Sequence, residues 1–248
     1  MCRSMRRLIE KRCQMIRLTM KGVAAMTYKD VNTLIEEGEG FEVEFKRKVS
    51  TPEKIAKTLV ALANTKGGHI LFGVDDDGSI VGVESEKSEV DLIEQAGTFY
   101  CIPEIHPDID IVPFDGIDVI VAYVRESPDK PHYFTGATNG DAVNGEETKV
   151  YIRVNANSVM ASKEVVRILR SEHSDAKPFT IEIGENEKRL FRYLDEHDRI
   201  TVPEFAKLVN ISDRRASRTL VSLVRAGVIR IHTLEKRDYF TLAGELPR

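Results

Sequence analysis

The chain has 248 residues, of which 42% are hydrophobic and 31% charged, and its formal net charge is −4. These values are typical of a soluble globular protein with one large domain or two ordinary ones, and no apolar run reaches the roughly 20 residues that span a bilayer. Cys2, Cys13 and Cys101 lie far apart, without a CxxC pair. This spacing indicates a reducing compartment, for which we expect the cytoplasm, and argues against a structural zinc site.

Charge is distributed unevenly along the chain. Residues 1–25 carry seven basic side chains and one acid, residues 26–184 carry 16 and 29, and residues 185–248 carry 13 and 10. The last segment is therefore a better candidate for phosphate contact than the acidic centre.

The basic segment 1–25 lacks the apolar core and the small-residue cleavage site of a signal peptide. The simplest interpretation is a disordered extension or an over-extended reading frame, with translation starting at Met26. A basic arm that binds nucleic acid is the functional alternative.

Residues 26–171 mix helical and strand patterns and form the first predicted domain. Capping residues, Pro52 at a helix start and two Asp-Gly turns mark its elements. This mixture predicts an α+β fold, with a mixed or antiparallel sheet and flanking helices. The polar segment 172–184 is the predicted linker. Helices are expected from Thr27 to Gly38, at 51–64, 86–99 and 162–170, and strands at 41–46, 69–74, 80–83, 109–114, 117–124 and 149–154.

Residues 185–248 predict three helices followed by two strands, which is the order of a winged helix-turn-helix domain. Thr201 and Glu204 form a capping box for the second helix, and Gly227 closes the third. The helices are expected at 185–197, from Thr201 through Leu208 and from Ser212 or Asp213 to Ala226, and the strands at 228–231 and 239–242.

Basic residues occupy the two parts of a winged helix that contact nucleic acid. Arg214, Arg215 and Arg218 lie in the half of the third helix that a recognition helix presents to the major groove. Lys236 and Arg237 lie in the predicted wing, within reach of phosphates. The alternative is a winged helix used for protein contact, with its arginines solvated.

Three motifs in the first domain follow one another in a specific order. They are Glu44-Phe45-Lys46, the run Ala-Asn-Thr-Lys-Gly-Gly at 63–68 and Gly-Val-Asp-Asp at 73–76, and the strand Tyr-Ile-Arg-Val comes later at 151–154. This pattern resembles the Schlafen AlbA-like domain, formerly called divergent AAA, over about residues 27–170. The resemblance implies either a DNA-binding domain of the kind often fused to winged helices, or a ribonuclease that acts on transfer RNA.

The nuclease members carry three acidic residues, which map here onto Glu39, Glu44 and Asp76. The resemblance implies that these carboxylates are catalytic and hold Mg²⁺ or Mn²⁺ if the protein is a nuclease. Glu39 and Glu44 are an odd number of residues apart, so a regular strand points them to opposite faces. They share a face only if Gly40 forms a bulge or the strand starts later.

Lys46 ends this acidic strand and Arg47 and Lys48 follow it, and all three are expected to contact a nucleic-acid backbone. The simpler interpretation of the acids makes Glu42 and Glu44 the solvated face of a strand and the run 75–77 an acidic turn. The nuclease relatives also carry a second lobe, which a homodimer would supply here. Gly67-Gly68 stands between a helix and a strand without a following GK[ST], so we expect no ATP site and no cofactor requirement for binding.

The leading hypothesis is a cytoplasmic DNA-binding regulator, expected to be a homodimer without a membrane segment. The alternatives are a divalent-metal-dependent endoribonuclease or RNA-processing factor, with RNA as the partner, and a protein-interaction adaptor.

Overall fold

The structure of the chain is a computed structural model, and it describes residues 25–48, 50–136, 148–172, 181–234 and 237–244. The expectations for the basic segment before residue 25 lie outside the described residues. So do those for most of the linker, at 173–180, and for Lys236. Within the described ranges every helix is too short or too polar to cross a membrane.

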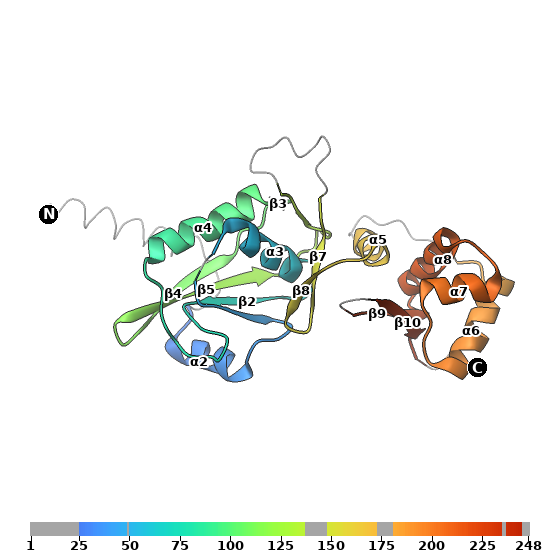
Figure 1. Cartoon of the computed structure of the whole chain (residues 1–248), viewed down its shortest axis with the longest axis horizontal. Coiled ribbons are helices and arrows are strands. Elements are labelled where there is room, and N and C mark those ends of the chain that lie inside the picture. Colours follow the sequence, from blue (N-terminus) through green and yellow to red (C-terminus); the bar gives the residue numbers. More distant parts are fainter. Residues whose placement is uncertain (1–24, 49, 137–147, 173–180, 235–236, 245–248) are drawn as a thin grey trace.

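A four-stranded mixed sheet organises the N-terminal unit (Figure 1), which confirms the predicted α+β class. Its strands β1 (Val43–Lys46), β2 (Gly67–Phe72), β5 (Ile117–Arg125) and β4 (Asp108–Phe114) lie side by side in this order. β1 and β2 are parallel, whereas β5 is antiparallel to both of its neighbours. The parallel pair needs a crossover connection, which α3 (Pro52–Ala63) supplies.

Both faces of this sheet are buried against helices, because successive strand residues point to opposite sides. One face packs against α3 and α4 (Glu86–Phe99), and the other packs against α2 (Tyr28–Glu37). The first core includes Ile70, Phe72, Ile120, Ala122 and Val124, and the second includes Val43, Phe45, Leu71, Val119 and Val121.

Two small hairpins and a helix complete the N-terminal unit. β3 (Cys101–Ile102) pairs with β6 (Tyr133–Phe134), and β7 (Tyr151–Val154) pairs with β8 (Asn157–Met160). The helix α5 (Lys163–Ser171) follows, with the Ser162 side chain accepting from the amide of Val165 as an N-cap.

The expected strand at residues 80–83 is wrong. Only an isolated bridge joins Val74 to Ile80. The amides of Val81 and Gly82 both donate to the carbonyl of Gly73, at 2.9 Å each. Because two consecutive amides share one acceptor, the chain turns here instead of extending the ladder.

The C-terminal unit has the predicted order of elements. Its helices are α6 (Glu185–His197), α7 (Val202–Val209) and α8 (Asp213–Arg225), followed by the antiparallel strands β9 (Ile229–Thr233) and β10 (Asp238–Leu242). An added bridge between Ile200 and Phe240 ties the segment before α7 to this hairpin. The unit has a core of its own, centred on Leu190, Leu194, Ile200, Phe205, Leu220, Leu223 and Phe240.

The two units meet where α5 packs against α8, and Figure 1 shows α5 between the sheet and the C-terminal helices. The buried Ser217 hydroxyl of α8 accepts from Arg167 Nη1 at 2.5 Å and donates to the Glu164 carboxylate. Ile231 of β9 packs against the apolar cluster that contains Val165 and Leu169 of α5. The contact therefore combines polar bonds with apolar burial.

Candidate nucleic-acid interface

The structure brings Arg214, Arg215 and Arg218 together as exposed side chains on α8. Ser212 caps the helix, its hydroxyl accepting from the amide of Arg215 at 3.4 Å. The buried residues Ala216, Leu220 and Leu223 belong to the core of the C-terminal unit. Because the apolar stripe fixes which side of α8 faces inward, the arginines are held toward solvent.

One flank of this arginine face is hollow. Arg215 and Arg218 line a cavity of about 330 Å³ together with Thr219 and Ser222 of the same helix. Glu182 and Glu187 line its other side. Carboxylates therefore border the arginines on the side of α6.

The predicted wing carries one described basic residue, Arg237, which is exposed. It lines a cavity of about 590 Å³ together with Lys207 of α7 and Ser162, the N-cap of α5. The pKa of the neighbouring Asp238 is raised because this residue is half-buried and lies near Glu164, although a hydrogen bond from Ser162 opposes the shift.

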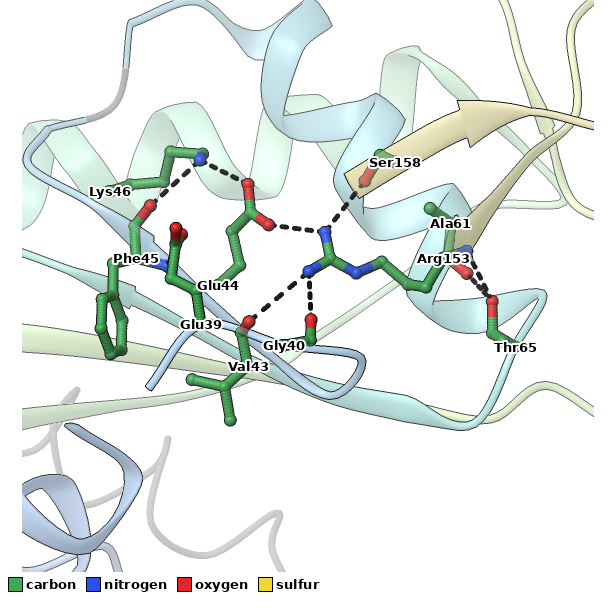
Figure 2. Close-up of polar contacts among 10 residues, drawn as sticks. All are labelled: Glu39, Gly40, Val43, Glu44, Phe45, Lys46, Ala61, Thr65, Arg153 and Ser158. Carbon is green, nitrogen blue, oxygen red and sulfur yellow. Dashed lines mark hydrogen bonds and ion pairs between the residues drawn. The ribbon is translucent and has the colours of Figure 1, made fainter. Parts of the chain in front are cut away.

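The acidic set predicted from the family resemblance has a different environment from the one expected. Glu44 is 8% exposed, so its interpretation as part of a solvated strand face is wrong. Its Oε2 lies 2.5 Å from Arg153 Nη1, and its Oε1 pairs with Lys46 Nζ (Figure 2). Glu42, the residue before β1, is exposed as expected.

Arg153 of β7 explains the burial of Glu44. Its side chain has no exposed surface, and Figure 2 shows its guanidinium pointing at the start of β1. Nη2 donates to the carbonyl of Gly40 at 2.5 Å, and Nη1 also donates to Ser158 Oγ at 3.2 Å. A buried charge is tolerated when it is paired and hydrogen-bonded. Nη1 and Nη2 of Arg153 are both hydrogen-bonded, whereas the buried Nε has no partner.

Glu39 and Asp76 lie in separate local surroundings. Glu39 Oε1 accepts from the amide of Phe45 at 2.9 Å, and the strand begins only at Val43, which is the late start that its odd spacing from Glu44 requires. Asp76 lies in a turn where its amide donates to Asp75 Oδ1 at 3.1 Å.

These carboxylates do not fit a divalent ion as they stand. Both oxygens of Glu44 are engaged by cations, and the described residues contain no group of three or more His, Cys, Asp or Glu that could hold a metal. Lewis-acid and water-activating roles need several convergent oxygen ligands, so the geometry supports no step through a metal here.

The basic run after β1 is partly engaged as well. Lys46 Nζ also donates to the carbonyl of Phe45 at 3.0 Å, and Arg47 Nη1 pairs with Asp75 Oδ2 at 2.6 Å. The side chain of Arg47 nevertheless remains 66% exposed, and Lys48 is exposed.

The Ala-Asn-Thr-Lys-Gly-Gly motif has a structural role. Asn64 Nδ2 donates to the carbonyls of His132 and Tyr151, at 2.9 and 3.0 Å, and its Oδ1 accepts from the amide of His132 at 2.7 Å. Thr65 Oγ1 donates to the carbonyl of Ala61 in α3 and accepts from the amide of Arg153 at 3.0 Å. The end of α3 is therefore the point where the late strands attach.

Two contacts described above could not be predicted from the sequence. The Glu44–Arg153 pair joins residues 109 positions apart, and the only available signal was an arginine inside an otherwise apolar strand. No sequence pattern predicts the contact of α5 with α8, because a serine such as Ser217 is common on the surface of a helix.

The chain therefore combines a mixed α+β sheet unit with a helical unit that carries exposed arginines. The motifs at 44–76 identify the family of the sheet unit. Residues 39–162, half of the chain, match the family model described as "Schlafen, AlbA_2". The chain belongs to this family, and membership points to a nucleic-acid-related function.

Two solved structures resemble the chain more loosely. The N-terminal domain of an ATP-dependent DNA helicase RecG-related protein from Nitrosomonas europaea is 28% identical, with a TM-score of 0.36, over 44% of this chain and 84% of that one. The DIP2311 protein from Corynebacterium diphtheriae is 17% identical, with a TM-score of 0.42, over 86% of this chain and 36% of that one. A search of curated proteins gives no match.

Proposed function

We propose that the protein binds duplex DNA as a regulator, with residues 185–248 acting as a winged helix-turn-helix domain and α8 as its recognition helix. The observation that carries the proposal is the set of exposed guanidinium groups of Arg214, Arg215 and Arg218 in the N-terminal half of α8. Arginine at this position of a helix binds guanine edges and phosphates, and the first turns of a recognition helix are the part that enters the major groove.

The remaining parts of the unit agree with this role. Arg237 adds an exposed basic side chain in the proposed wing, where winged helices contact phosphates. A homodimer in the cytoplasm belongs to the same proposal, since two copies of α8 would meet half-sites about 34 Å apart on one face of the duplex.

The sheet unit supports binding more than cleavage. In a ribonuclease of the proposed type, Glu44 would offer oxygens to a metal, whereas here Arg153 and Lys46 occupy both of them. We therefore assign the Glu44–Arg153 pair to holding β1 and β7 together.

The proposal is tested by titrating the full chain into a fluorescein-labelled DNA duplex of about 30 base pairs, roughly three helical turns, across a salt series. Arg214→Ala/Arg218→Ala is expected to weaken binding at least tenfold and to reduce the salt slope by about 2, because each lost phosphate contact removes about 0.9. The matched control Arg189→Ala/Arg192→Ala removes the same charge from exposed positions of α6 and should leave binding nearly unchanged.

The same protein is then incubated with transfer RNA in Mn²⁺ or EDTA and the products are separated on a gel. Intact RNA and salt-dependent duplex binding support the regulator. Mn²⁺-dependent fragments, or the absence of duplex binding at low salt, contradict it.

A further inference from the structure

The helix α5 is a basic segment within an acidic unit. Residues 26–184 carry 16 basic and 29 acidic side chains, yet the nine residues of α5 hold Lys163, Arg167 and Arg170 against the single acid Glu164. Such a local reversal of charge marks a surface suited to an anionic partner.

The packing of α5 on α8 turns its one acid inward. Glu164 accepts from the buried Ser217 hydroxyl, and Arg167 donates to the same hydroxyl. The Glu164 carboxylate is therefore engaged in the contact between the two helices, whereas the side chains of Lys163 and Arg170 are exposed to solvent.

This contact lies directly beside the arginine face of α8. Ser217 and Val221, one helical turn apart, are buried outside the core of the C-terminal unit, and Ser217 touches α5. Arg214 and Arg218 are also one turn apart, and Arg218 is the residue next to Ser217. Because successive residues are separated by 100° around a helix, the arginines border the α5 side of α8.

The opposite flank of α8 has the wrong charge for a phosphate strand. Glu182 and Glu187 line the cavity next to Arg215 and Arg218 on the side of α6. A duplex strand is repelled there and attracted on the side of α5.

Arg170 is oriented for such a contact. Its Nε donates to the Tyr133 hydroxyl at 3.0 Å, and its guanidinium lies 5.8 Å from the centre of the Tyr133 ring. These contacts fix the plane of the group through Nε, so an acceptor would be bound through the Nη atoms.

We propose that Lys163 and Arg170 of α5 bind the phosphates of the duplex strand that borders α8, so that the N-terminal unit contacts DNA through this helix and not through residues 46–48. Packed helix axes lie about 8–10 Å apart and the major groove is about 12 Å wide, so the strand next to an inserted α8 passes over α5. The inference rests on the proposed role of α8.

The test uses the full chain and the same labelled duplex across a salt series. Lys163→Ala/Arg170→Ala is expected to weaken binding about tenfold or more and to lower the salt slope by about 2, and Lys163→Glu/Arg170→Glu should weaken binding further. Arg47→Ala/Lys48→Ala removes the same charge from the end of β1 and should leave the slope unchanged. Unchanged melting temperatures show that the variants remain folded.

The outcomes separate this inference from the proposed function. One outcome is that wild-type binding depends on Arg214 and Arg218 but the α5 variants retain the full salt slope. The proposed role of α8 is then retained, and the proposed contact of α5 with DNA is wrong. Tighter binding by the α5 variants also overturns it, since α5 would then obstruct the duplex. If the wild-type protein binds no duplex, the proposed function fails first.

Discussion

Arg153 connects β7 to the start of β1 in the N-terminal unit. Its side chain is fully buried, and it reaches Glu44, Gly40 and Ser158 from a strand that forms late in the chain. A buried ion pair contributes little net stability compared with apolar residues of the same volume, but removing one partner leaves the other charge without compensation.

Arg153→Met is therefore expected to lower the free energy of unfolding by about 3–5 kcal/mol, because the Glu44 carboxylate stays buried with Lys46 as its single cation. Glu44→Leu/Arg153→Met removes both charges and should recover much of this loss. Urea denaturation measures both values. A loss below about 1 kcal/mol in the single variant would show that the pair is not needed.

Gly68 takes a backbone conformation that other residues avoid, with φ of 146°. A Cβ there would overlap the backbone of Glu42, the residue just before β1, so the parallel pairing of β1 with β2 depends on the absence of a side chain at position 68. Gly68→Ala should lower the free energy of unfolding by about 2 kcal/mol or more. Gly116, with φ of 94° but open space around it, is the control, and Gly116→Ala should cost about 1 kcal/mol. Equal losses would contradict the steric argument.

His132 gives the N-terminal unit a pH dependence. Burial is the main cause that lowers its pKa, outweighing the hydrogen bond to the Pro103 carbonyl and the charge of Asp129. Because the folded-state pKa lies below the unfolded value of about 6.5, the stability that the neutral ring contributes is present above that value and is lost as pH falls. We expect His132→Gln to have a flatter unfolding free energy between about pH 7 and 5 than the wild type. A parallel pH profile for the two proteins would exclude this linkage.

At the scale of elements, capping and periodicity predicted the helices well. Thr51, Ser162 and Ser212 cap α3, α5 and α8 as the sequence indicates, because an N-cap is a local interaction between residues three apart. The hairpin of β4 and β5 was equally predictable from its Asp115-Gly116 turn, and both residues have positive φ.

The elements that were missed are short and depend on distant partners. β3 and β6 are two residues each and pair across about 30 positions, and β8 has four residues with no alternating pattern. Such strands are defined by what lies beside them, so a single sequence carries no periodic signal for them.

In the candidate site, too, the local features could be predicted from the sequence and the long-range contacts could not. The arginines of α8 were predictable because helix, cap and charge are all local features. The partner of Glu44 lies 109 residues away, so the sequence alone left that carboxylate open to interpretation as solvated or metal-binding.

At the scale of the whole molecule, the contact between α5 and α8 couples the two units. Ser217 is the buried centre of this contact. Ser217→Val fills a similar volume but leaves Glu164 and Arg167 without their shared partner. We expect it to lower the melting temperature of the full chain by a few degrees, equivalent to about 1–2 kcal/mol, as measured by calorimetry. No change in melting would show that the polar bonds do not hold the units together.

The central claim is that α8 enters the major groove, and methylation interference tests it most directly. Sequences bound by the full chain are selected from a random duplex library, methylated with dimethyl sulfate and separated into bound and free fractions. Guanine N7 faces the major groove and adenine N3 the minor groove. The account predicts that N7 methylation at specific guanines excludes the duplex from the bound fraction, and that Arg214→Ala/Arg218→Ala abolishes this pattern. Interference confined to adenine N3, or none at any position, would contradict it.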